Sequence, residues 1–118
     1  MIILGGKRAC GKSTELVKIS HINNIPIIVI DHARANVLKN IAKKEGIKIP
    51  EPIVYKNYDR YVIGKKINEI LIDDVEDILQ RIFDYSRIVI ITTSKQFVPL
   101  DFNNNNNKDL TKIISKEI

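Results

Sequence analysis

The sequence is poor in several features, and each shortage excludes a class of protein. Its 118 residues include one cysteine, Cys10, which excludes a disulfide framework and a cysteine-built zinc site. No apolar run reaches the roughly 18 residues of a membrane span, and the start lacks the residue order of a secretory signal. The length suits one domain of about 100 to 150 residues. We therefore expect a cytoplasmic protein with no membrane partner.

The charge balance is mildly basic. Lys and Arg outnumber Asp and Glu by 19 to 14, which suits an anionic partner such as a nucleotide or a nucleic acid. The same excess is typical of a solvated surface in a sequence rich in lysine, isoleucine and asparagine. We favour this second interpretation, because specific nucleic-acid binders usually cluster their charge.

Short apolar runs alternate with segments of helical spacing along most of the chain. Strands are expected at residues 1–4, 25–30, 53–55, 69–72 and 88–91, and helices at 13–22, 32–45 and 75–85. Run 25–30 is apolar throughout, with Pro26 at its entrance, which is typical of an interior parallel strand. Residues 56–66 have no clear pattern. The alternation predicts a three-layer α/β fold, with a mainly parallel sheet of four to five strands and helices on both faces.

The segment from Gly6 to Ser13 fits the phosphate-binding loop (P-loop, or Walker A motif). It follows the first expected strand and opens the first expected helix, where backbone N–H groups can surround a polyphosphate. Lys12 is placed to reach the β and γ phosphates, and the Ser13 hydroxyl to bind Mg²⁺. The residues expected to contact nucleotide are Gly6, Lys7, Arg8, Ala9, Cys10, Gly11, Lys12, Ser13 and Thr14.

A P-loop needs a second anchor for its metal, normally an aspartate at the end of a buried strand. Asp73 follows the apolar run Ile70-Leu71-Ile72, so we expect it at the carboxyl edge of the sheet. Open α/β sheets bind their ligands at this edge. Asp73 or Asp74 would otherwise cap the helix that begins near Val75. We expect Asp73 to be the metal ligand together with Ser13, and capping by Asp74 is compatible with this role.

Hydrolysis also requires a carboxylate that orients or deprotonates water. Asp74 is the nearest candidate, with Glu76 behind it, although first-turn acids are also favoured by the helix dipole alone. Ser94 closes the polar triplet after the expected strand 88–91, where a hydroxyl can sense the γ phosphate or merely end a strand. The catalytic candidates are therefore Lys12, Asp74, Glu76 and Ser94.

With both anchors placed, the pattern resembles the additional-strand class of P-loop ATPases, which groups AAA+ proteins, RecA-like proteins and helicases. Residues 71–79 are similar to the Walker B segment of AAA+ proteins, and the paired aspartates resemble the bacterial replication-initiator branch. Residues 90–94 are similar to the sensor strand, with Ser94 where that class usually has asparagine. The resemblance implies ATP and Mg²⁺ as cofactors.

The sequence has two further resemblances, one over most of its length and one over a short segment. Over most of residues 1–94 the chain is similar to the small single-domain P-loop proteins of phages and prophages. Residues 11–16 are similar to the start of the first helix of thymidine kinases, but that family has a cysteine zinc knuckle and a lasso segment that this sequence lacks. We expect residues 1–100 to form the P-loop nucleotide-binding domain, and 101–118 an asparagine-rich loop and a short C-terminal tail.

The sequence favours a minimal Mg-ATP-binding protein, a weak ATPase or ATP-dependent accessory factor acting with a nucleic-acid or protein partner; a homo-oligomer is left open. No helical lid is visible, and four arginines are interpreted as scattered surface residues rather than arginine fingers: Arg34, Arg60, Arg81 and Arg87. One alternative is a non-enzymatic binding or inhibitory module on a P-loop fold. A small nucleoside or nucleotide kinase is a third hypothesis, weakened by the lack of an arginine-rich lid segment.

Overall fold

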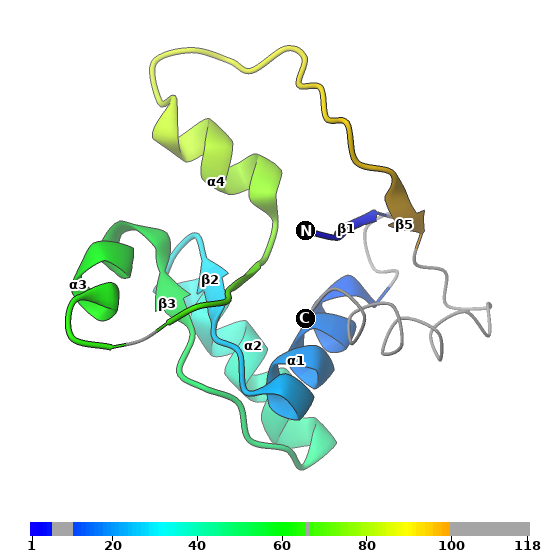
Figure 1. Ribbon diagram of the computed structural model, residues 1–118, viewed down its shortest axis with the longest axis vertical. Helices are drawn as coiled ribbons and strands as arrows, with labels where there is room; N and C mark the ends of the chain where they lie inside the picture. Colours follow the sequence, from blue (N-terminus) through cyan, green and yellow to red (C-terminus); the bar gives the residue numbers. More distant parts are fainter. Residues whose placement is uncertain (6–10, 66, 100–118) are drawn as a thin grey trace. The chain divides into compact units, whose positions relative to one another are not determined.

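The structure is a computed structural model that describes residues 1–5, 11–65 and 67–99 (Figure 1). The chain divides into two compact units: a terminal unit of Met1–Lys12 and Ile90–Ile118, and a central unit of Ser13–Val89. Residues 6–10 of the expected P-loop and the asparagine-rich tail 101–118 lie outside the described residues, so what we expect of them stays a prediction.

The described residues form a mixed α/β structure with four α-helices and short parallel strands. A 3₁₀ turn, η1, ends within the segment 56–66 that had no clear sequence pattern, and a short helix, α3, lies within it. In chain order the elements are β1 (Ile3–Gly5), α1 (Lys12–Asn23), β2 (Ile27–Val29), α2 (His32–Glu45), β3 (Ile53–Val54), η1 (Tyr55–Asn57), α3 (Tyr58–Val62), β4 (Leu71–Ile72), α4 (Val75–Ile82) and β5 (Phe97–Pro99).

The central unit contains a three-stranded parallel sheet in the order β3-β2-β4. In its register Ile28 lies opposite Ile53 on one side and Ile72 on the other. Strand β2 is therefore the interior strand, as its uninterrupted apolar run predicted, and Pro26 stands just before it. The described strands pair in two groups, this sheet and the pair β1-β5, and not in one sheet of four to five strands.

Successive residues of β2 enter two separate hydrophobic clusters, because side chains alternate between the faces of a strand. Ile27 and Val29 belong to a cluster with residues of α1 and α2, including Val17 and Leu38. Ile28 belongs to a second cluster, with residues of β3 and α4. The three β2 side chains are at most 4% exposed, so the sheet is covered on both faces at its central strand.

Helix α2 has the bounds expected from the sequence, and both of its ends are capped. At the start, Oδ1 of Asp31 accepts a hydrogen bond from the backbone N–H of Arg34 at 2.9 Å, which satisfies a donor without an intrahelical partner. At the end, Gly46 adopts φ 68°, a left-handed conformation that glycine accepts without steric cost. The cap at Asp31 fixes where α2 begins, and the cap at Gly46 fixes where it ends.

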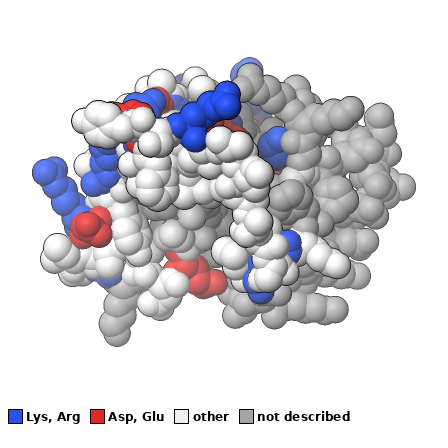
Figure 2. All heavy atoms as spheres, turned by 90° about the horizontal axis from the view of Figure 1, so that it is seen from above, with Lys and Arg blue, Asp and Glu red and all other residues white. Residues whose placement is uncertain are grey.

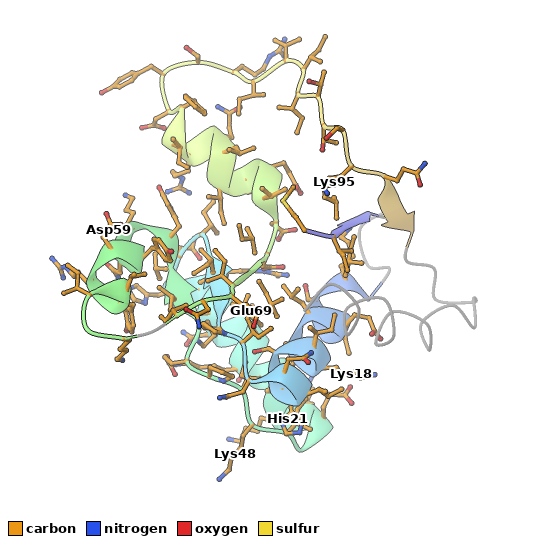
Figure 3. All side chains as sticks on the ribbon, in the orientation of Figure 1. Lys18, His21, Lys48, Asp59, Glu69 and Lys95 are labelled. Atoms are coloured by element: carbon orange, nitrogen blue, oxygen red, sulfur yellow. The ribbon has the colours of Figure 1, made fainter. Side chains whose placement is uncertain are left out.

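Helix α1 is tied to its surroundings by side-chain hydrogen bonds to main-chain carbonyls. The buried Ser20 donates from Oγ to the carbonyl of Ile25 at 2.6 Å. Nδ1 of His21 lies 2.6 Å from the carbonyl oxygen of Lys48, which follows α2, and Figure 3 labels both residues. The two contacts hold α1 against the entrance of β2 and the exit of α2.

The prediction of a strand at residues 88–91 is wrong. The structure has no regular element there, and Val89, Ile90 and Ile91 are 74%, 80% and 60% exposed. In the terminal unit β1 pairs in parallel with β5, six residues further along the chain than the expected strand's end at Ile91. An apolar run becomes a strand only where a neighbour offers backbone hydrogen bonds, and in the described pairs β5 provides that neighbour for β1.

Two properties of the described residues concern hydropathy and charge. Of the helices that the structure describes, none combines the length and the hydropathy that a membrane crossing needs. On the face drawn in Figure 2, the basic side chains of described residues lie among acidic and neutral ones.

Candidate functional site

Polar side chains meet where two neighbouring parallel strands end. Arg34 lies in the first turn of α2, just after β2, and Asp73 follows β4 directly. Because β2 and β4 are parallel neighbours, their carboxyl ends share one edge of the sheet. Nε of Arg34 donates a hydrogen bond to Oδ2 of Asp73 at 2.5 Å. This charge-assisted bond is the centre of the candidate site.

Asp73 is a buried carboxylate, with its side chain 5% exposed. Its backbone N–H donates to the carbonyl of Ile28 at 3.0 Å, so the β4–β2 ladder continues through this residue and holds it at the sheet edge. Burial raises the pKa of Asp73 above 3.8, and the hydrogen bond from Arg34 counteracts that rise. The neighbouring guanidinium therefore favours the ionised form of the carboxylate, against the effect of burial.

Arg34 stands at the helix end that disfavours a cation. The first turn of α2 contains no acidic residue, and the positive end of the helix dipole repels a guanidinium. The hydrogen bond to Asp73 nevertheless raises the pKa of Arg34 above its ordinary value, against the lowering caused by burial. Side chains in a helix lean toward its N-terminus, which directs Arg34 to the strand ends.

Ser13 completes the contact. Nη2 of Arg34 donates a hydrogen bond to Oγ of Ser13, the second residue of α1. The guanidinium thus binds Ser13 through one nitrogen and Asp73 through another. These are the two residues that the sequence predicted as magnesium ligands, and the structure brings them onto a single arginine.

Asp74 borders the same cation. Its Oδ2 lies 3.6 Å from Nε of Arg34, and its side chain is 30% exposed. It takes the N-cap position of α4, but its side chain makes no capping hydrogen bond, and its φ is 50°. Such positive φ values are uncommon outside glycine and are found most often at Asn and Asp. Capping in the ordinary sense is therefore not the role of Asp74.

The remaining predicted site residues lie as follows. Glu76 is exposed in the first turn of α4, and Ser94 is exposed in a bend of the terminal unit. Gly11 has φ 89° directly before α1, a conformation that only glycine adopts freely. Lys12 and Thr14 lie in the first turn of α1, and residues 6–10 are outside the described ranges. The described contacts join Ser13, Arg34, Asp73 and Asp74.

Arg34 is the residue that the sequence interpretation missed, since it was placed with the scattered surface arginines. That interpretation holds for the other three, Arg60, Arg81 and Arg87, which are exposed. The sequence did contain a signal for Arg34. Asp31, which caps the helix, directly follows the expected interior strand, and Arg34 lies three residues later. A residue there shares the sheet edge with the aspartate that ends a neighbouring strand.

The donor set can be compared with what magnesium requires. The hydroxyl of Ser13 and the carboxylate of Asp73 are oxygen ligands of the type that Mg²⁺ prefers. Within residues 1–5, 11–65 and 67–99, no group of three or more His, Cys, Asp or Glu could hold a metal ion. The two oxygens fit the ion in chemical type, and the other ligands would have to come from phosphate and water, as is usual for Mg²⁺ at nucleotide sites.

Comparison of the chain with protein-family models, curated protein sequences and solved structures finds no match.

Proposed function

We propose that the protein binds Mg-ATP through a P-loop of the additional-strand ATPase class, on a three-layer fold. Gly6 to Gly11 would surround the phosphates, Lys12 would contact the β and γ phosphates, and Ser13 and Asp73 would hold the metal. Turnover would be slow, and the protein would act as a weak ATPase or an ATP-dependent accessory factor. Its partner would be a nucleic acid or a protein.

One observation carries the proposal: Ser13 and Asp73, far apart in the sequence, bind the same guanidinium. They were selected independently, Ser13 from the glycine–lysine–serine spacing and Asp73 from its place after an apolar run. Their shared partner supports the hypothesis that both belong to one charged site. The left-handed Gly11 before α1 adds support, because a P-loop requires glycine where the chain turns into the helix.

Slow turnover is inferred from the candidates for water activation. Asp74, the first candidate, forms an ion pair with Nε of Arg34 at 3.6 Å, so its carboxylate already has a partner. Glu76 is exposed. Arginine fingers are worth about a thousandfold or more in rate, and Arg60, Arg81 and Arg87 have no described contact with Ser13 or Asp73.

Equilibrium binding of ATP in the presence of Mg²⁺ tests the proposal. Lys12→Ala removes the charge expected to contact the phosphates, so we expect its ATP dissociation constant to rise by at least about tenfold, or 1.4 kcal/mol. Lys18→Ala is the matched control, because Lys18 lies on the same helix with its side chain 47% exposed and pairs only loosely with Glu15, at 3.9 Å. Undiminished ATP binding by Lys12→Ala would contradict the proposal.

A non-enzymatic nucleotide-binding module is the second candidate function. It is favoured by the irregular, exposed segment 90–94, where a sensor strand was expected. A turnover assay with and without single-stranded and double-stranded DNA separates the two. Phosphate release that is lost in Asp74→Asn supports the weak ATPase, whereas ATP binding without any release supports the module.

A further inference from the structure

The two predicted magnesium ligands of this site already have a cation. One guanidinium nitrogen of Arg34 donates to Oγ of Ser13, and another donates to Oδ2 of Asp73. Arg34 therefore contacts both of these oxygens, Oγ of Ser13 and Oδ2 of Asp73. Its own side chain is 28% exposed, whereas that of Asp73 is 5% exposed, so the arginine reaches a buried carboxylate from the solvent side.

We propose that Arg34 substitutes for the metal in the nucleotide-free protein, and that binding of Mg-nucleotide displaces its guanidinium from Ser13 and Asp73. This inference rests on the proposed function and adds a residue that makes metal binding depend on nucleotide. The buried carboxylate is then paired with a cation in both states, first with the guanidinium and then with the metal.

Arg34 must be displaced because it occupies the same oxygens that the metal would bind. An oxygen that accepts a short hydrogen bond from a guanidinium does not at the same time present that lone pair to a metal at about 2.0 to 2.1 Å. Two cations at one buried carboxylate would also repel each other strongly in a medium of low dielectric constant. Arg34 and Mg²⁺ are therefore competitors for Ser13 and Asp73.

The competition makes metal and nucleotide cooperate. Mg²⁺ alone must break both hydrogen bonds of Arg34 and leaves the guanidinium with Asp74, 3.6 Å from its Nε, as its remaining anionic neighbour. A polyphosphate supplies oxygen ligands to the metal and negative charge for the released guanidinium, so the exchange becomes favourable. Coupling of this kind between two ligands is typically about 5- to 150-fold in affinity.

Thermal unfolding of the full-length chain, titrated with MgCl₂ alone, tests the competition. Arg34→Met removes the competitor and keeps a long apolar stem, so we expect half-maximal stabilisation at a Mg²⁺ concentration at least about tenfold lower than in the wild type. Lys39→Met is the matched control: it removes a cation from the same helix, where Lys39 pairs with the exposed Glu51, and should respond like the wild type. An unchanged Mg²⁺ response in Arg34→Met would overturn the proposal.

Two further variants cover the case in which Arg34→Met does not fold. Arg34→Lys keeps the charge but lacks the fork that joins two oxygens, so its Mg²⁺ response should lie between those of the wild type and Arg34→Met. The double variant Arg34→Met/Asp73→Asn has no buried charge to compensate and should fold without responding to Mg²⁺. A Mg²⁺ response of Arg34→Lys equal to that of the wild type, or a response of the double variant as strong as that of Arg34→Met, would overturn the proposal.

ATP titrations of the same proteins separate this inference from the proposed function. If wild-type protein binds ATP and Mg²⁺ strengthens that binding equally in the wild type and Arg34→Lys, the role of Arg34 is overturned while the proposed function stands. If the wild type does not bind ATP at any Mg²⁺ concentration, the proposed function is overturned, and the nucleotide-driven exchange of Arg34 with it. Stronger ATP–Mg²⁺ coupling in the wild type than in Arg34→Lys supports both.

Discussion

Among the ion pairs of helix α2, two have opposite surroundings. Arg34 in its first turn pairs with Asp73, and Lys39 further along pairs with Glu51. The side chain of Asp73 is 5% exposed, whereas that of Glu51 is 61% exposed. Water solvates Glu51 with or without its lysine, but Asp73 depends on a cation supplied by the protein or a ligand. Two ion pairs of one helix therefore differ in what their loss costs.

The largest expected effect is that of Arg34→Met on stability. Removing one partner of a buried ion pair leaves an uncompensated charge, so we expect the free energy of unfolding at neutral pH to fall by about 3 kcal/mol. Lys39→Met should lower it by less than about 1 kcal/mol. Chemical denaturation monitored by circular dichroism measures both. Equal losses in the two variants would contradict the difference between the pairs.

The pH dependence of that loss is the second prediction. Burial raises the pKa of Asp73 in the folded protein, and Arg34 opposes this, so the pKa rises further in Arg34→Met. An acid whose folded-state pKa is raised contributes full stability below its unfolded pKa, 3.8 here, and loses it as the pH rises through the folded-state value. The deficit of Arg34→Met relative to wild type should be small near about pH 4 and grow toward about pH 7.

Chemical denaturation of the wild type and Arg34→Met at several pH values checks this prediction. Lys39→Met serves again as the control, because it removes a cation of the same helix whose partner, Glu51, is exposed. A deficit of Arg34→Met that stays constant with pH would mean that packing of the arginine stem, rather than the charge of Asp73, dominates the loss.

A smaller effect is expected when the other partner is changed. Asp73→Asn removes the buried charge itself, while Arg34 keeps its hydrogen bond to Ser13 and is 28% exposed to water. We expect the free energy of unfolding to change by about 1 kcal/mol or less. The same denaturation experiment measures it. A loss as large as that of Arg34→Met would show that the guanidinium, and not the carboxylate, is the costly group to leave unpaired.

The sequence predicted those parts of the structure that depend on local pattern. The bounds of α2, its glycine stop at Gly46 and the interior position of β2 were predicted because capping and apolar runs act over a few residues. Ser13 and Asp73 were selected for the same reason. Their shared partner could not be predicted, because Arg34 reaches Asp73 only through the pairing of β2 with β4.

The expected strand at 88–91 failed for a related reason. Its isoleucines and valine have high strand propensity, but pairing depends on which other segment reaches the neighbouring strand. In the described residues β1 pairs with β5, Phe97–Pro99, whose sequence gave no strand signal of similar strength. Local propensity thus identifies candidates for a strand, and tertiary pairing selects among them.

The central claim, that Ser13 and Asp73 form a metal–nucleotide site, is tested most directly by the Mg²⁺ dependence of ATP affinity. ATP is titrated into wild-type protein and Ser13→Ala, once with MgCl₂ and once with a chelator. We predict that Mg²⁺ strengthens ATP binding at least about tenfold in the wild type and that most of this gain is lost in Ser13→Ala. ATP affinity that is the same with and without Mg²⁺ in the wild type would contradict the claim.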